Sequence, residues 1–356
     1  MGDYFKERNL NNIKRLRRVL AELPPFCTDF MVGIENTSSP LTRLNYAHDL
    51  RIFFDYLIAE TPDFPFDSIR AFDIDSLKKV TGFHLEKFLS YLSLYTFNGK
   101  RLSNGESAKS RKLSSVRNLF KYLYRKGILE ENITEKVELP KKHDKEILRL
   151  EINEIVRLLD EVEAGSKLSE GQLRFHKKNR LRDLAILTVF LGTGIRISEL
   201  VGLNLSDLNF DSNAFTVTRK GGNRAVLYFH DEVESALKDY LAQRKINLSQ
   251  LADFESIPLF LSIQNNRIST KAVQMLVKKY CKNVTPGKKI TPHKLRSTFG
   301  TNLYRETNDI YVVADVLGHR DVNTTKKHYA AISDDIRRNA ARHVKLRDDK
   351  APPLDD

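Results

Sequence analysis

Residues 291–299 read TPHKLRSTF, and this stretch predicts a helix with two polar functional groups near its start. Thr291 has the side chain of a helix N-cap, and Pro292 suits the first helical position because its missing N–H is not needed there. His293 then lies at the helix N-terminus, where the helix dipole disfavours a charged imidazolium. Arg296 follows one turn later on roughly the same face. Alone, a histidine and an arginine at this spacing are more often a structural pair, so the rest of the sequence must decide.

A second arginine lies upstream in TGIRISEL, residues 193–200. Arg196 follows the loop glycine Gly194 and opens the next predicted helix, with Glu199 three residues later on a neighbouring position of one face. An ordinary surface ion pair is the commoner meaning of this spacing. The alternative is that Glu199 holds a guanidinium whose planar fork binds a phosphate.

A lysine lies between these two arginines on a predicted hairpin. Phe215–Thr218 and Ala225–Phe229 have the pattern of short strands, and the glycine-bearing segment RKGGNR, residues 219–224, joins them. Such a segment between two strands predicts a β-hairpin turn. Lys220 is in that turn, where a solvated lysine is the generic expectation.

The sequence beyond residue 310 supplies a second histidine and a tyrosine. In LGHRDVNTTKKHY, residues 317–329, Gly318 allows a tight turn after a helix. His319 is therefore either a helix-capping side chain or a hydrogen-bond donor to an anion. Tyr329 would ordinarily be core packing, since a phenol with a pKa of about 10 is a poor nucleophile unaided. His328 adjoins it, but no carboxylate or cysteine cluster at suitable spacing accompanies the pair, which argues against a metal site.

Together these residue types suit cleavage of a phosphodiester without metal or ATP. A nucleophile that adds to phosphorus increases the negative charge on the non-bridging oxygens, so catalysis depends on cations and donors already fixed around them. A tyrosine hydroxyl can attack phosphorus and conserve the bond energy as a covalent phosphotyrosine. A lysine can protonate the departing oxygen.

These motifs, in this order, resemble the tyrosine recombinase (phage integrase) family, which includes the Xer proteins. The resemblance covers nearly the whole chain, and the motifs VTRKGG and TPHKLR are most similar to those of the single-protein Xer recombinases of the XerS type. The resemblance implies that Lys220 is the general acid. This sequence departs from the family pattern at Ser297, where many relatives have a histidine. The resemblance implies no cofactor and no metal. It implies the catalytic residues Arg196, Lys220, His293, Arg296, His319 and Tyr329, with Glu199 supporting Arg196.

The chain is strongly basic, with 59 Lys and Arg against 46 Asp and Glu and a net charge of +13. This balance favours a polyanionic partner, although ribosome-associated and membrane-surface proteins are basic as well. The charge is concentrated in residues 100–126, which contain nine Lys or Arg and one acid, Glu106. Salt bridges within one helix cannot neutralise that excess.

The same segment has a helical stripe formed by Leu113, Val116, Phe120 and Leu123. A solvated charged face opposite the stripe is the usual meaning of such a pattern. The clustering instead favours contact with the DNA backbone. On this basis the candidate DNA-binding residues are Lys109, Arg111, Lys112, Arg117 and Lys121, joined by Arg219 and Arg224, which flank the lysine of the hairpin.

The length of 356 residues suggests two domains, and the proline- and charge-rich stretch at 138–146, ELPKKHDKE, places their boundary near residue 145. Residues 1–145 are predicted to be a helical core-binding (DNA-binding) domain and residues 146–356 a catalytic domain. The fold class expected is mainly α with a small β-sheet in the catalytic domain (α+β). Further helices are predicted after the start signal at Thr37–Pro40 and over 85–94, 113–123, 151–162, 181–190, 270–279, 292–304 and 310–317.

The resemblance further implies a C-shaped, two-domain clamp around duplex DNA with specific recombination sites, a homotetramer on DNA, and a DNA translocase as a candidate regulator. Two distant cysteines, Cys27 and Cys281, and a charged N-terminus fit a cytoplasmic protein without a membrane segment. The segment Asp334–Leu346 is helix-prone and could dock on a neighbouring subunit or on its own domain. Three alternatives stay open: a mobile-element or phage integrase, a type IB topoisomerase, and a catalytically silent DNA-binding protein.

Overall fold

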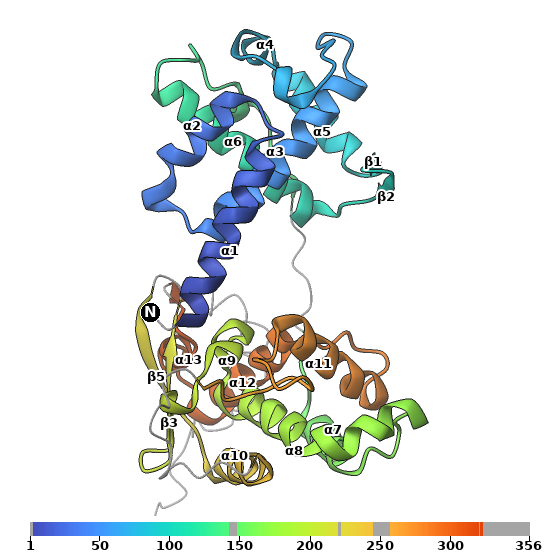
Figure 1. Cartoon of the computed structure of the whole chain (residues 1–356), viewed down its shortest axis with the longest axis vertical. Helices are drawn as coiled ribbons and strands as arrows, with labels where there is room; N and C mark the ends of the chain where they lie inside the picture. The colour runs from blue at the N-terminus through green and yellow to red at the C-terminus, as the bar shows by residue number, and fades with distance from the viewer. Residues whose placement is uncertain (1–2, 142–147, 220–221, 245–256, 320, 323–356) are drawn as a thin grey trace, which may run out of the picture. The chain divides into compact units, whose positions relative to one another are not determined.

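The computed structural model describes residues 3–141, 148–219, 222–244, 257–319 and 321–322 (Figure 1). The chain divides into two compact units, one comprising Asp3–Lys145 and the other beginning at Glu146. Among the described residues, helices predominate in both units, and each unit has one small antiparallel sheet. The predicted fold class, mainly helical with a small sheet in the second unit, is confirmed.

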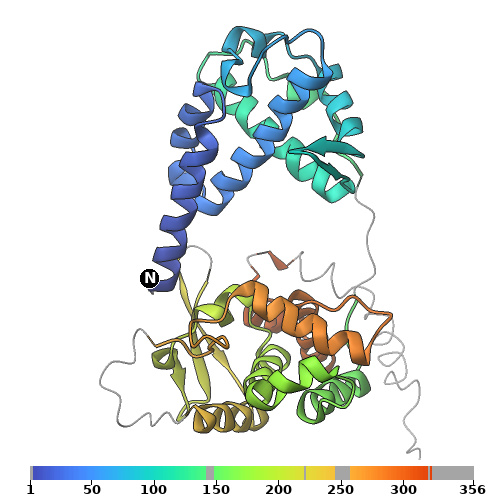
Figure 2. The same ribbon diagram turned by 45° about the vertical axis from the view of Figure 1, so that its right-hand side comes forward.

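The N-terminal unit is a helical bundle with a short hairpin. A central helix, α3, is buried on several sides because Leu44, Leu50, Phe53, Phe54 and Leu57 all point into the core. In both views α1 and α3 lie side by side, and α6 also contacts α3 (Figures 1 and 2). Its elements are α1 (Asp3–Leu20), α2 (Pro25–Gly33), α3 (Pro40–Glu60), α4 (Ile74–Lys78), α5 (Gly82–Tyr91), β1 (Tyr95–Phe97), β2 (Lys100–Leu102) and α6 (Glu106–Arg125).

The predicted start of α3 is confirmed. Ser39 is the N-cap, and its hydroxyl accepts the backbone N–H of Thr42 at 3.2 Å, while Pro40 occupies the first turn. The β1–β2 hairpin was not predicted from the sequence. Its turn is Asn98–Gly99, both with positive φ, which is a common signal for a two-residue hairpin.

The C-terminal unit is built around α8, whose last turns contain Ala185, Ile186, Leu187, Val189 and Phe190, all fully buried. Helices α7, α10 and α12 contact α8. In Figures 1 and 2 the sheet lies at one side of this unit and α7, α8 and α11 at the other. The elements are α7 (Ile152–Ala164), α8 (Glu170–Thr193), α9 (Ile197–Gly202), β3 (Leu208–Asn209), β4 (Ala214–Thr218), β5 (Arg224–Tyr228), α10 (Asp231–Gln243), α11 (Thr270–Val284), α12 (Pro292–Thr307) and α13 (Ile310–Leu317).

The predicted hairpin is present as β4 and β5. The two strands are antiparallel, with Phe215 opposite Leu227 and Thr218 opposite Arg224. Strand β3 extends the sheet on the other side of β4, so that β5 is an edge strand. Among the described helices, none is both long and apolar enough to span a membrane.

Candidate active site

The last turn of α13 is the point at which the candidate site residues meet. This helix ends at Gly318, which adopts the left-handed conformation with φ 61°. The final carbonyls of a helix have no partner within the helix. Here the carbonyls of residues 316, 317 and 318 each accept a hydrogen bond from a different arginine: Arg219, Arg296 and Arg196, respectively. Three guanidinium groups from distant parts of the sequence are therefore neighbours.

Arg196 is held on two sides. It is the N-cap residue of α9, and its Nη1 donates to Oε1 of Glu199 at 2.9 Å, while its backbone N–H donates to Oε2 at 3.0 Å. Its Nη2 donates to the Gly318 carbonyl at 3.0 Å. The Glu199 side chain is only 3% exposed, whereas that of Arg196 is 35% exposed. The predicted pairing is thus present, and the guanidinium retains donors for an anion because these two bonds use two of its five N–H groups.

Arg296 lies deeper and is 5% exposed. Its Nη1 donates to the Gly194 carbonyl at 2.5 Å, and its Nη2 donates to the Leu317 carbonyl. Gly194 ends α8 with φ 61°, and a Cβ at that position would lie 2.4 Å from the ring of Phe299. Arg296, which lies on α12, therefore links the end of α8 to the end of α13.

The two candidate histidines lie at helix ends. His293 is exposed in the first turn of α12, which Thr291 caps by accepting the N–H of Lys294. His319 follows Gly318, and its backbone N–H donates to the Ala314 carbonyl at 2.9 Å. That bond closes the left-handed turn after α13 and places His319 next to the carbonyls that hold the arginines. Lys220 and Tyr329 lie outside the described residues, as does the segment 334–346.

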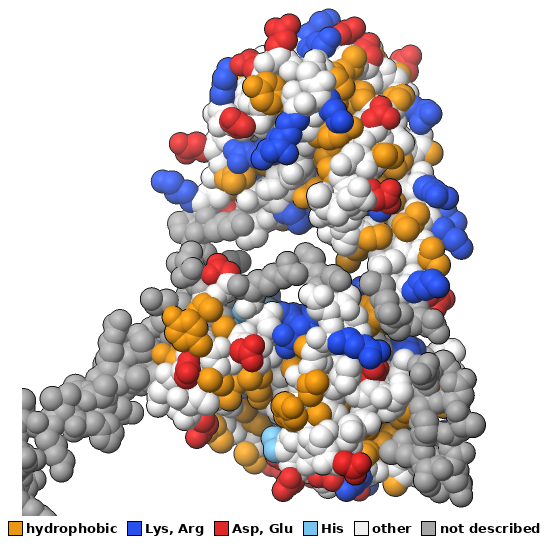
Figure 3. All heavy atoms as spheres, turned by 90° about the vertical axis from the view of Figure 1, so that its left-hand side faces the viewer, with side chains coloured by type: hydrophobic (Ala, Val, Ile, Leu, Met, Phe, Trp, Pro, Cys, Tyr) orange, Lys and Arg blue, Asp and Glu red, His pale blue; other side chains and the backbone are white. Residues whose placement is uncertain are grey.

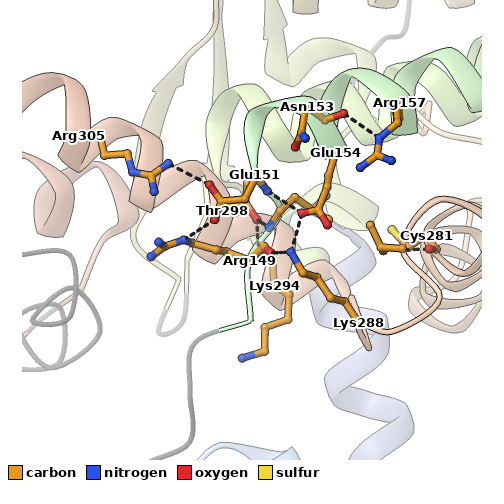
Figure 4. Close-up of polar contacts among 12 residues, drawn as sticks. Arg149, Glu151, Asn153, Glu154, Arg157, Cys281, Lys288, Lys294, Thr298 and Arg305 are labelled. Carbon is orange, nitrogen blue, oxygen red and sulfur yellow. Dashed lines mark hydrogen bonds and ion pairs between the residues drawn. The ribbon is translucent and has the colours of Figure 1, made fainter. Parts of the chain in front are cut away.

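Helix α12 is fixed by a polar cluster that the sequence reading missed (Figure 4). The backbone N–H of Leu150 donates to Oγ1 of Thr298 at 3.0 Å. Thr298 lies two residues after Arg296 on α12. Nη1 of Arg305 lies 3.4 Å from Oε2 of Glu151, at the start of α7. These contacts fasten the first described residues of the C-terminal unit to the helix that carries His293 and Arg296.

Lys288 extends the same cluster. Its Nζ donates to Oε2 of Glu154 at 2.6 Å and to the Arg149 carbonyl at 3.2 Å. Burial alone would raise the pKa of Glu154, but the hydrogen bonds from Lys288 and from the Glu151 amide outweigh it and leave that pKa below its usual value. A signal was available in the sequence, since Glu151 and Glu154 form a reciprocal capping box at the start of α7.

The candidate DNA-binding residues of α6 have protein partners that were not predicted. Arg111 forms an ion pair with the buried carboxylate of Asp49, although half of its side chain remains exposed. Arg117 donates to the Val137 carbonyl, and Lys109 lies 3.4 Å from Glu106. Arg111 is therefore held by a carboxylate of α3 and Arg117 by a backbone carbonyl, whereas the Lys109–Glu106 pair lies within α6 itself.

Lys112, one of the candidate DNA-binding residues, is buried instead of lying on the helix surface. Lys112 is 6% exposed, its Nζ donates to Oδ1 of Asn104 at 3.2 Å, and burial lowers its pKa. Lys121 and, in the other unit, Arg224 are exposed. On the face of the N-terminal unit shown in Figure 3, basic side chains are interspersed with acidic and hydrophobic ones.

Comparison with known proteins identifies the family. The profile described as Phage integrase family matches residues 149–335. Tyrosine recombinase XerC of Caldanaerobacter subterraneus subsp. tengcongensis is 35% identical over 326 residues, which is 89% of this chain and 86% of the relative. Tyrosine recombinase XerS of Streptococcus agalactiae is 31% identical over 322 residues, 84% of this chain and 89% of the relative. The chain belongs to the tyrosine recombinase (phage integrase) family.

Solved structures with a similar fold include a site-specific recombinase and a transposon integrase, both in complex with DNA. XerH site-specific recombinase bound to a palindromic difH substrate, in a post-cleavage complex, has a TM-score of 0.64 at 19% identity, covering 85% of this chain and 80% of that one. The Tn1549 transposon integrase in complex with circular intermediate DNA has a TM-score of 0.63 at 18% identity, covering 89% and 99%. The tyrosine recombinases are DNA breaking-rejoining enzymes, and relatives named XerC and XerS both match, so the predicted Xer-like membership is confirmed.

Replacing Glu154 with glutamine should make the stability of this tyrosine recombinase less dependent on pH. The folded-state pKa of Glu154 lies below its usual value of 4.5, so the carboxylate stabilises the fold above that pH and loses its effect as the pH falls through the folded pKa. The free energy of unfolding in urea should be lower for Glu154→Gln by about 1 to 2 kcal/mol at neutral pH. The difference should shrink below pH 4.5.

The exposed Glu163 on the same helix provides the control, and Glu163→Gln should match the wild type throughout. A deficit of Glu154→Gln that stayed constant down to acid pH would contradict an electrostatic role for this carboxylate.

Replacing Glu199 with glutamine should lower the rate of DNA cleavage while DNA affinity stays close to that of the wild type. The substitution keeps the shape but removes the charge that orients Arg196. Partners that orient a ligating side chain in metal sites contribute on the order of 10- to 100-fold to activity, and we expect a loss in that range. Single-turnover cleavage and a binding titration measure the two quantities, with the exposed Glu232→Gln as control. Equal losses in binding and cleavage would show that Glu199 does not act through the reacting phosphate.

Proposed function

We propose that this chain is a Xer-like, site-specific recombinase that cuts and rejoins duplex DNA through a 3′-phosphotyrosine, and that its role is the resolution of chromosome dimers before cell division. The observation that carries the chemistry is the convergence of Arg196 and Arg296 on adjacent carbonyls of one turn, beside His319. Two guanidinium groups fixed in this way suit a single phosphodiester. The biological role is supported by the extent of the match to relatives named XerC and XerS.

In the proposed reaction, Arg196, Arg296 and His319 donate to the non-bridging oxygens of the scissile phosphate. The hydroxyl oxygen of Tyr329 attacks phosphorus, and the bond between phosphorus and O5′ breaks. His293 accepts the proton of the tyrosine, and Lys220 gives a proton to O5′, so that the departing strand leaves as an alcohol. The phosphate stays esterified to Tyr329 until a 5′ hydroxyl from another strand attacks it and reverses these steps.

This scheme needs neither metal nor ATP, because the energy of the phosphodiester is conserved in the tyrosine ester. The charge that develops on the phosphate is balanced by cations that are already in place. Under this proposal both units contact duplex DNA, four copies assemble on two recombination sites, and a DNA translocase regulates them in the cytoplasm. Lys121, Arg224 and the exposed part of Arg111 are the proposed contacts to the DNA backbone.

The nucleophile is tested with a suicide substrate that traps the covalent complex. We expect Tyr329→Phe to bind DNA with wild-type affinity and to form no adduct that resists denaturation, because phenylalanine lacks the attacking oxygen. Tyr311, which is 70% exposed on α13, supplies the matched control, and Tyr311→Phe should form the adduct normally. Recovery of the covalent species from the Tyr329 variant would exclude this residue as the nucleophile.

The biological role is tested by the choice of sites. Sequencing DNA trapped covalently in the host should give one chromosomal site, and two identical copies of it should recombine in a plasmid resolution assay. Exchange only between dissimilar attachment sites would instead identify a mobile-element integrase, the alternative that the resemblance leaves open. Relaxation of supercoiled DNA without exchange between sites would identify a type IB topoisomerase.

A further inference from the structure

Arg219 is joined to the candidate active site more closely than the sequence suggested. It directly follows β4, and its backbone N–H donates to the Asn223 carbonyl at 2.8 Å. The backbone N–H of Gly222 donates back to the Arg219 carbonyl at 3.1 Å. These two bonds close the base of the hairpin turn, and Lys220 is the next residue in the chain.

The side chain of Arg219 crosses to α13. Its Nη2 donates to the Val316 carbonyl at 3.1 Å. A Cβ built on Gly318 would lie 2.0 Å from its Nη1 and 2.3 Å from its Cζ, so the guanidinium lies directly on that glycine. Two features therefore require a glycine at position 318: its positive φ, and the space beside its Cα that the Arg219 side chain fills. The packing joins the hairpin to the turn that also holds Arg196 and Arg296.

The contact is specific to an arginine. An ammonium group is a compact point charge, whereas the planar guanidinium can lie flat on a glycine and still reach a carbonyl at its edge. Its Nε is buried and has no hydrogen-bond partner among the described residues. A buried donor left unpaired destabilises the folded state. The structure therefore keeps Arg219 in this position despite an opposing cost, and the initial expectation of a DNA backbone contact does not explain why.

We propose that Arg219 is a positioning residue for the general acid. It fastens the hairpin that carries Lys220 to the phosphate-binding turn, and thereby sets the place from which Lys220 reaches the leaving oxygen. This inference rests on the proposed function, since it takes Lys220 as the donor of the proton to O5′. Under this inference, Arg219 affects the rate of one step of the reaction, the breaking of the bond between phosphorus and O5′.

The leaving group provides the test. In a substrate with sulfur in place of O5′, the leaving group is a thiol, which is far more acidic than an alcohol and departs without a proton donor. General acid catalysis contributes on the order of 100- to 10,000-fold. We expect Lys220→Ala to lose at least about 100-fold, and Arg219→Ala about tenfold or more, in single-turnover cleavage of the ordinary substrate. Both variants should cleave the 5′-thio substrate at nearly the wild-type rate.

Two further variants separate positioning from loss of charge. Arg224→Ala removes the same charge from the other end of the turn, where Arg224 is exposed on β5 and pairs in register with Thr218. It should weaken DNA binding and slow both substrates alike. Arg219→Lys retains the charge but not the planar fork, and should show a leaving-group-dependent defect close to that of Arg219→Ala. Because Arg219→Lys is the milder change, it serves if the alanine variant does not fold.

The outcomes distinguish the inference from the proposed function. If wild-type protein forms no covalent adduct, or if sulfur does not rescue Lys220→Ala, the proposed function or its general acid is wrong. If Lys220→Ala is rescued and both Arg219 variants are slowed equally on the two substrates, Arg219 acts on the phosphate or on folding, and the positioning role is overturned. The double variant gives a second criterion, because Arg219→Ala should add little to the defect of Lys220→Ala.

Discussion

The candidate active site depends on three peptide carbonyls that a helix leaves unpaired. Residues 316–318 end α13, and without outside donors their oxygens would be partly buried and unsatisfied. Arg219, Arg296 and Arg196 supply those donors from the hairpin, α12 and the start of α9. One backbone turn thus determines the relative positions of elements that are distant in the sequence. A shift of α13 would move all three guanidinium groups together.

This arrangement is electrostatically unlike the usual anion site at a helix N-terminus. The C-terminal end of a helix carries partial negative charge, which favours cations and repels phosphate. Three guanidinium groups at this helix end make the local charge positive, because the partial negative charge of the helix end is only about half an elementary charge and each guanidinium carries a full positive one. The helix end fixes the cations, and the cations make the position attractive to a phosphodiester. The same logic explains the buried Glu199, whose charge orients Arg196 without neutralising the site as a whole.

Local signals in the sequence were sufficient for the elements that carry the site. Thr291 and Pro292 begin α12 as predicted, and Gly318 makes the expected turn before His319. The hairpin around Lys220 could be read from glycines between two β-rich runs, and the same rule applied to Asn98–Gly99 would have found β1 and β2. Each of these depends on residues only a few positions apart.

The partners of the arginines could not be read in this way. Arg219 contacts a carbonyl almost one hundred positions later in the chain, and a backbone carbonyl has no signature in the sequence. Charge patterning likewise identified α6 as basic but not which cations are engaged: Lys112 is buried against Asn104, and Arg111 is held by Asp49. A pattern of charges gives the number of cations on a helix, whereas their partners depend on how neighbouring helices pack.

The described part of the site uses arginines because each of these side chains has to bind fixed partners in the protein and also face an anion. Arg196 must satisfy a carbonyl and a carboxylate while retaining donors for a phosphate, and Arg296 must join two carbonyls of different helices from a nearly buried position. A lysine has three donors on one rotating nitrogen, so it could not hold two fixed partners and also present a defined edge to an anion. The guanidinium has five donors in one plane. Preorganised cations of this kind need little rearrangement when a bound phosphate acquires charge. Under the proposed function, the carbonyls that hold these arginines therefore serve catalysis by positioning them.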